Sequence, residues 1–110
     1  MNLSDEIIEQ FISAIKSSRE FSELKQAKGV IDRTPGIKAQ VDEFNRKQLE
    51  VFGTKDPKEA EAKASELNKK FSMLSRIPEV ERFLKASKKF NELMLKINQR
   101  ISESIQSELK

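Results

Sequence analysis

The chain has 110 residues, which is room for one domain whose fold buries roughly two-thirds of the surface that the unfolded chain exposes. Charged residues make up 35% and apolar residues only 36%, a balance typical of long, partly exposed helices rather than of a thick globule. Because the chain has neither cysteine nor histidine, disulfides, thiolate chemistry, Cys/His zinc sites and imidazole catalysis are excluded.

The net charge of +3 is too small to indicate nucleic-acid binding by itself, but the charges are unevenly distributed. Residues 1–62 carry ten positive and twelve negative side chains, whereas residues 63–100 carry ten positive and four negative ones. The amino-terminal sequence lacks the layout of a signal peptide, and nowhere do about 18 apolar residues run together. We therefore expect a cytoplasmic protein whose positive field lies in the second half of the chain.

The first predicted helix begins at Ser4, a typical N-cap, with Leu3 and Ile8 at the positions of a hydrophobic staple. Its apolar residues recur at helical spacing through Ile15. Residues 17–20 match a capping box, which predicts a bend near Ser17 and a second helix. The face of that helix expected to be buried consists of Phe21, Leu24, Ala27 and Ile31.

Two further helices are predicted to form an antiparallel hairpin. Thr34 and Pro35 indicate a cap followed by proline at the first helical position, and Gly53 ends this helix. The apolar residues expected on one side of it are Ile37, Val41, Phe44, Leu49 and Phe52. Residues 56–59 repeat the start signal, and the next apolar row is Ala60, Ala64, Leu67, Phe71 and Leu74. The short link between the two helices favours the hairpin.

Pro78 opens the last predicted helix, which has no internal breaker. At about 1.5 Å per residue, roughly 32 residues reach about 48 Å, which is longer than a small domain is wide. We therefore expect part of its apolar stripe to lie on another subunit or another protein. The near-heptad spacing of Phe90, Met94, Ile97 and Ile101 is compatible with such an interface but is too short for a free coiled coil.

Most candidate chemistry is better explained by ordinary helix surfaces. Ser-x-x-Lys occurs at Ser22 and at Ser107, but the companion motifs of a serine nucleophile are absent. The acidic pairs Asp42/Glu43 and Glu20/Glu23 alternate with Lys and Arg, so ion pairs on a solvated surface are favoured over a cation site. The seven phenylalanines lie on apolar stripes, which favours core packing over stacking on RNA bases. The Ile7–Ile15 stripe has acidic flanks, which argue against membrane binding.

Basic residues gather on the last helix, with only Glu81 and Glu92 as acidic neighbours among them. Lysines on a helix usually serve only to solvate it. The alternative is a surface for RNA phosphates or an acidic partner. The residues of this candidate surface are Arg82, Lys85, Lys88, Lys89, Lys96 and Arg100.

The sequence also resembles a known family. Ser18-Arg19-Glu20-Phe21-x-x-Leu24 and the block from Pro78 through Val80, Phe83, Leu84, Ala86, Phe90-Asn91, Leu93 and Ile97-Asn98 to Ile101 are similar to the YlbF/YmcA family of small bacterial helical proteins. The similarity in order and spacing covers nearly the whole chain. The Phe-Asn and Ile-Asn pairs, seven residues apart, are the most distinctive part.

The resemblance implies a regulatory adaptor. Characterised YlbF/YmcA proteins associate with one another and with the RNase Y machinery, and they influence RNA processing, competence, sporulation and biofilm formation in Firmicutes. Some carry an iron-sulfur cluster on cysteines, which this chain lacks. In its short length this chain is more similar to the cysteine-free YheA-type members of the family.

We therefore expect an all-α protein of about five helices, a single domain over 1–110, with an antiparallel helical hairpin, a long C-terminal helix and an oligomeric bundle. Its expected role is non-enzymatic and needs no metal or cofactor. The expected partners are a second copy, paralogous family members and a ribonuclease assembly; a small RNA-binding module is the alternative. Asn91 and Asn98 lie beside the apolar stripe, where they either fix the register of the interface or remain ordinary exposed residues. The predicted oligomer interface is Phe90, Asn91, Met94, Ile97, Asn98, Ile101 and Ile105.

Overall fold

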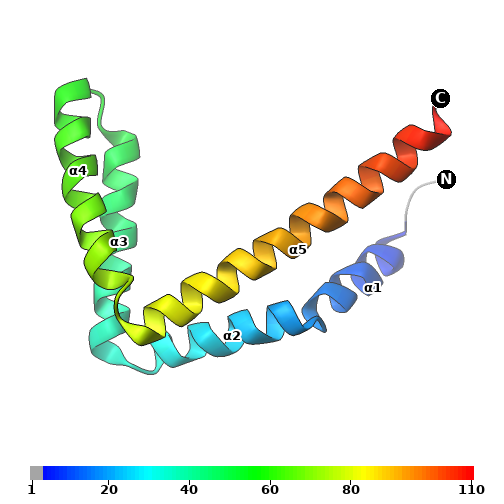
Figure 1. Cartoon of the computed structure of the whole chain (residues 1–110), viewed down its shortest axis with the longest axis horizontal. Helices are drawn as coiled ribbons and strands as arrows, with labels where there is room; N and C mark the ends of the chain where they lie inside the picture. Colours follow the sequence, from blue (N-terminus) through cyan, green and yellow to red (C-terminus); the bar gives the residue numbers. More distant parts are fainter. Residues whose placement is uncertain (1–3) are drawn as a thin grey trace. The chain divides into compact units, whose positions relative to one another are not determined.

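A computed structural model describes residues 4–110 and contains five α-helices and no strand in that range (Figure 1). The predicted all-α class and the number of helices are confirmed. The helices are α1 (Asp5–Lys16), α2 (Arg19–Asp32), α3 (Pro35–Gly53), α4 (Pro57–Leu74) and α5 (Pro78–Glu108). None of the helices in residues 4–110 is long and apolar enough to cross a membrane.

The first two helix starts are set by serine side chains. Ser4 caps α1 as predicted, because its hydroxyl accepts a hydrogen bond of 3.2 Å from the backbone N–H of Ile7. Leu3, the expected staple residue, lies outside the described residues. The cap of α2 is Ser18 rather than the predicted Ser17: the Ser18 hydroxyl accepts from the N–H of Phe21 at 3.1 Å. Ser17 instead donates its hydroxyl to a carbonyl of the preceding turn. The bend was predicted correctly, but the cap lies one residue later.

The starts of α3 and α4 depend on proline at the first helical position. Asp56 caps α4 by accepting from the N–H of Lys58 at 3.4 Å. Thr34 was expected to cap α3, but its hydroxyl donates to the carbonyl of Val30 at 2.8 Å and no side-chain cap bond forms. Thr34 therefore closes the end of α2, while Pro35 fixes the backbone that opens α3.

The chain falls into two compact units. Unit 1 comprises Met1–Gln26, of which residues 4–26 are described, and Lys85–Lys110; it contains α1, the start of α2 and most of α5. Unit 2 is Ala27–Leu84 and contains the α3–α4 pair with the adjoining ends of α2 and α5. The expectation of a single domain over 1–110 stays a prediction.

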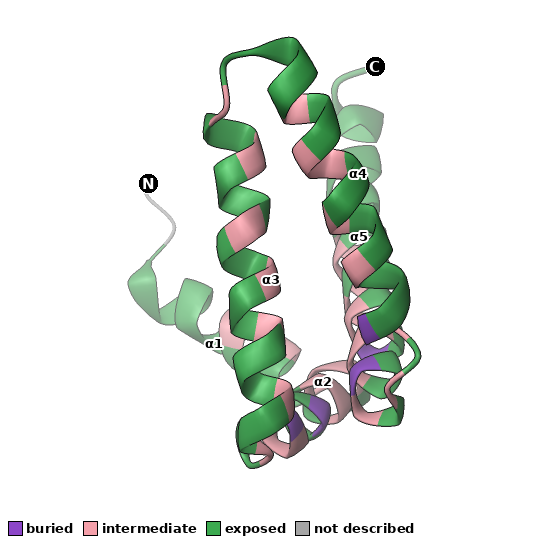
Figure 2. Cartoon of the chain, turned by 90° about the vertical axis from the view of Figure 1, so that its left-hand side faces the viewer, coloured by how far each residue is buried: buried purple, intermediate pink, exposed green. Residues whose placement is uncertain are grey.

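Unit 2 is built around the α3–α4 pair, whose two helices run side by side (Figures 1 and 2). Thr54, at the end of α3, contacts Lys63 near the start of α4 at 3.2 Å. The rings of Phe44 and Phe71 lie further along the pair, with centroids 5.8 Å apart. Between these two contacts the position moves toward the start of α3, from Thr54 to Phe44, and toward the end of α4, from Lys63 to Phe71. The two helices are therefore antiparallel.

The core of unit 2 lies at the end of the α3–α4 pair that adjoins α2 and α5. Ile31, Leu74 and Val80 are its buried members. Half-buried side chains pack around them from α3, the α4–α5 connection and the first turns of α5: Ile37, Val41, Phe44, Ile77, Phe83 and Leu84. Figure 2 shows how few residues are buried compared with the exposed surface of every helix. The core is therefore small, as the low apolar content predicts.

One predicted face of α3 is wrong in its second half. Leu49 and Phe52 were expected beside Ile37, Val41 and Phe44, but they are 71% and 81% exposed. Val51 is the half-buried residue there. It follows Ile37 by fourteen residues, close to four full turns, and so continues the face that meets α4. Leu49 and Phe52 lie off that face.

Candidate interaction surfaces

The apolar row of α5 changes from covered to uncovered along the helix. Near its middle, Phe90 is half-buried and its ring lies 5.7 Å from that of Phe21 on α2. Leu93, Met94 and Ile97 are half-buried as well. Beyond them Ile101 is 45% exposed, Ile105 56% and Leu109 77%. The last turns of α5 therefore present a row of large apolar side chains to solvent.

The same unit leaves apolar side chains of α1 uncovered. Ile7, Ile8 and Phe11 are exposed, and Ile12 and Ile15 are only half-buried. Large apolar side chains that gather on an exposed surface mark interaction sites more often than single ones do. Ala86 is the one buried side chain of unit 1 within residues 4–110. Unit 1 therefore has more apolar side chain than it covers by itself.

Asn91 and Asn98 lie on α5 and are both exposed. Their seven-residue spacing puts them on one side of the helix, next to Phe90 and Ile97. Neither is buried within the chain, so neither needs an internal partner. The hypothesis that they fix the register of an interface stays a prediction.

The six basic residues predicted as a partner surface are all on α5 and all exposed. Lys85, Lys89, Lys96 and Arg100 are spaced by four, seven and four residues, so they share one side of the helix. We call these four residues the basic face. Lys88 lies off this row, and Arg82 belongs to the part of α5 in unit 2.

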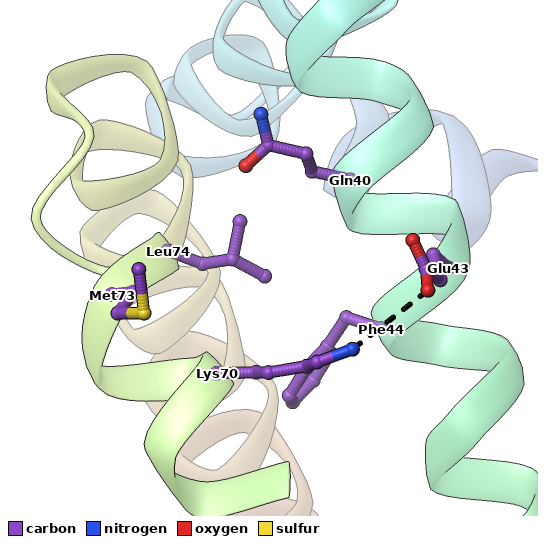
Figure 3. A pocket seen from close by; sticks show the side chains of 6 residues that line it. All are labelled: Gln40, Glu43, Phe44, Lys70, Met73 and Leu74. Carbon is purple, nitrogen blue, oxygen red and sulfur yellow. Dashed lines mark ion pairs between the residues drawn. The ribbon is translucent and has the colours of Figure 1, made fainter.

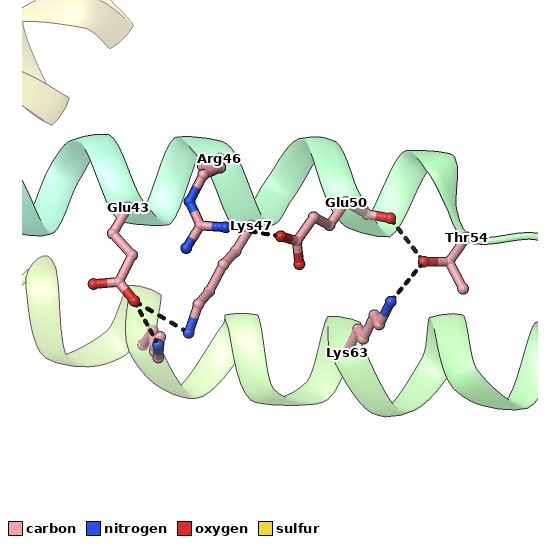
Figure 4. A network of polar contacts seen from close by, with 7 residues as sticks. Glu43, Arg46, Lys47, Glu50, Thr54 and Lys63 are labelled. Atoms are coloured by element: carbon pink, nitrogen blue, oxygen red, sulfur yellow. Dashed lines mark hydrogen bonds and ion pairs between the residues drawn. The ribbon is translucent and has the colours of Figure 1, made fainter.

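The α3–α4 pair carries a different charge pattern, in which several cations are paired with carboxylates (Figure 4). Arg46 bonds Glu50 at 2.9 Å one turn further along α3. Glu43 lies 3.3 Å from Lys47 and 3.7 Å from Lys70 of α4. All of these groups remain accessible to water, so each pair contributes little to stability.

The contacts among Glu43, Lys47 and Lys70 shift the pKa of each of these three groups. The hydrogen bond and the positive charge of Lys47 lower the pKa of the Glu43 carboxyl, and Lys70 adds to this effect. Contact with Lys70 and with Glu43 raises the pKa of Lys47. The pKa of Lys70 is lowered because it lies beside the Lys47 ammonium group. Glu43 is therefore an ionised carboxylate between two lysines, an arrangement suited to holding the two helices in register.

A pocket of about 220 Å³ opens beside the Glu43–Lys70 contact, and the sequence did not predict it (Figure 3). It lies between α3 and α4 and is lined by Gln40, Glu43, Phe44, Lys70, Met73 and Leu74. Its charged groups already neutralise one another, and the rest of the lining is mainly apolar. The arrangement offers no activated nucleophile or general base.

A comparison with known families shows to which protein family the chain belongs. The family model described as control of competence regulator ComK, YlbF/YmcA, matches residues 5–106. The chain belongs to the YlbF/YmcA family. The resemblance to this family, predicted from the Ser18–Leu24 segment and the block from Pro78 to Ile101, is therefore confirmed.

Among curated proteins, this YlbF/YmcA chain is similar to the UPF0342 protein of Caldicellulosiruptor bescii. It is 28% identical to this chain over 104 residues, which cover 92% of this chain and 87% of the relative. The family description connects this group with the control of competence. It is a regulatory family rather than a known enzyme family.

The remaining candidates for chemistry in this YlbF/YmcA chain lie on ordinary helix surfaces. Ser22 and Lys25 are exposed, and the Ser22 hydroxyl accepts from Gln26 at 3.4 Å. Asp42 pairs with Lys38 at 3.1 Å, and this hydrogen bond raises the pKa of Lys38. No group of three or more acidic residues placed to hold a metal ion occurs in the described part of the chain.

Proposed function

We propose that this YlbF/YmcA protein is a non-catalytic regulator that acts by binding other protein chains, beginning with a second copy of itself. The observation that supports the proposal is the uncovered apolar row of α5, with Ile101 and Ile105 about half exposed. Burying one such side chain contributes about 1.5–3 kcal/mol. Two or three of them on each copy supply much of the free energy that a stable pair needs.

The partners that we propose for this regulator are suggested by its family. The printed family description concerns control of the competence regulator ComK, and we propose that this chain takes part in control of that kind. The resemblance to characterised members extends the proposal to an adaptor role beside RNase Y, together with paralogous YlbF/YmcA proteins. In this scheme the exposed apolar side chains of α1, Ile7, Ile8 and Phe11, are available to a further protein partner.

The experiment changes the α5 row at its exposed end. In the variant Ile101→Gln/Ile105→Gln the helix stays soluble but loses two apolar contacts between copies. We expect self-association, measured by sedimentation equilibrium, to weaken about 100-fold or more, since each lost contact of 1.4 kcal/mol corresponds to a factor of ten.

Leu95→Gln is the matched control. Leu95 is on the same helix and 58% exposed, but it lies on another side of α5 from Ile101. We expect its self-association to equal that of the unmodified chain. If the two variants weaken association equally, or if neither does, the proposed surface is wrong.

A further inference from the structure

Six of the ten cations between Lys28 and Lys70 in unit 2 are paired with carboxylates, whereas three cations of α5 in unit 1 have no such pairing among residues 4–110. Between Lys28 and Lys70, six ion pairs join a lysine or arginine to a carboxylate, five of them one helical turn apart. On α5, by contrast, Lys89, Lys96 and Arg100 have no ion-pair partner within the described residues. Their charges are therefore available to a partner outside the chain.

The geometry of the basic face is that of a straight cationic row. Lys85 and Arg100 are fifteen residues apart on one uninterrupted helix, which corresponds to about 22 Å at 1.5 Å per residue. Lys89 and Lys96 lie between them on the same side. From residue 85 to residue 100 the helix carries five cations and a single carboxylate, Glu92, which lies on the same side of the helix, seven residues after Lys85 and four before Lys96. A linear polyanion is the partner that fits a row of this kind.

The basic face is also separate from the apolar row. Arg100 and Ile101 are neighbours in sequence, so they lie about 100° apart around the helix axis. A partner on the basic face therefore leaves the exposed Ile101 and Ile105 accessible to a second copy. The two surfaces of α5 can be occupied at the same time.

We propose that the basic face, Lys85, Lys89, Lys96 and Arg100, binds the phosphate backbone of nucleic acid without reading its sequence. This goes beyond the proposed regulator, which needs only protein contacts. An acidic protein is the poorer fit, because protein interfaces have an apolar and aromatic centre and none of the exposed large apolar side chains of α5 lies on this side of the helix. Phosphate contacts need only cations. No aromatic side chain lies on this face to stack on a base, so the base sequence is not read.

The test measures binding to a fluorescent 20-nucleotide single-stranded RNA, and to DNA of the same sequence, from 50 to 200 mM salt. For about four phosphate contacts on a single strand, the logarithm of the affinity falls with that of the salt concentration with a slope near −3. The variant Lys89→Gln/Lys96→Gln/Arg100→Gln removes three contacts. We expect its affinity at 50 mM salt to fall at least tenfold and the slope to become shallower by about 2.

A second triple variant, Lys55→Gln/Lys58→Gln/Lys69→Gln, is the control for net charge. These lysines are exposed, lie in unit 2 and have no ion-pair partner within residues 4–110. We expect the control to bind within twofold of the unmodified chain, with both variants keeping their helical circular dichroism. Equal binding of RNA and DNA supports backbone recognition. The proposal is overturned if neither nucleic acid binds at 50 mM salt, if both variants lose affinity equally, or if polyglutamate binds more tightly than RNA.

Discussion

The two units of this chain differ in how they use their apolar and charged side chains. Unit 2 has a buried core of Ile31, Leu74 and Val80, and six of its ten cations between Lys28 and Lys70 are paired with carboxylates. In the described part of unit 1 the one buried side chain is Ala86. Unit 1 instead exposes large apolar residues on α1 and α5, and its Lys89, Lys96 and Arg100 have no ion-pair partner within residues 4–110.

This difference indicates that the two units have different roles. A folded unit must bury enough apolar surface to offset the entropy of ordering its chain. Unit 2 meets part of this requirement with its own core, whereas unit 1 leaves large apolar residues exposed. We infer that unit 2 mainly stabilises the fold and that unit 1 carries the binding surfaces.

The largest expected effect concerns the core of unit 2. Leu74→Ala removes a buried side chain and leaves a cavity, so we expect the free energy of unfolding to fall by about 2–5 kcal/mol. The neighbouring Met73 is 71% exposed, and Met73→Ala should change stability by about 0.5 kcal/mol or less. Urea denaturation of both variants measures the difference. Equal losses would show that the core of unit 2 is not the stabilising region.

An intermediate effect is expected at the start of α2. Ser18→Ala removes the hydroxyl that caps the helix, and we expect a loss of about 1 kcal/mol in the free energy of unfolding. Ser17→Ala removes a hydroxyl that only donates to the preceding turn, so its effect should be close to zero. The same denaturation measurement distinguishes them. A larger loss for Ser17→Ala would mean that the predicted capping box at residues 17–20 forms after all.

The smallest effect is expected at Glu43 of the α3–α4 pair. Lys47 lowers the pKa of Glu43 below its ordinary value of 4.5, so the ionised carboxylate stabilises the fold above that pH. This contribution is lost as the pH falls through the lowered pKa. Glu43→Gln should therefore show a smaller fall in Tm than the unmodified chain between pH 6 and pH 3.

Glu61→Gln is the control for the pH experiment, since Glu61 is exposed and has no ion-pair partner within residues 4–110. Its Tm should follow that of the unmodified chain over the same range. If Glu43→Gln also follows the unmodified chain, the Glu43–Lys47–Lys70 contacts do not stabilise unit 2.

Local signals in the sequence predicted the helices, because their starts depend on residues within one turn. Ser4, Pro35, Asp56 and Pro78 each lie where a helix begins. The error at Ser17 has the same origin: two adjacent serines can both cap, and the choice depends on which hydroxyl the bend directs toward α2. The sequence spacing does not contain that information.

Features that depend on the pairing of α3 with α4 were not predictable from the sequence. Leu49 and Phe52 are apolar and have helical spacing, but the side of α3 that meets α4 includes Lys47 and Thr54. The pocket beside Glu43 likewise needs the register between Glu43 and Lys70, which are 27 residues apart. The basic face was visible in the sequence, but only its spacing on an uninterrupted helix separates Lys88 from the other four cations.

The most direct test of the account is the mass of the unmodified chain in solution. We expect sedimentation equilibrium to show a dimer or larger assembly in the micromolar range that dissociates on dilution, because α5 leaves Ile101 and Ile105 uncovered within one chain. A monomer at every concentration up to 100 μM, with amides of residues 97–108 protected from hydrogen exchange, would contradict it.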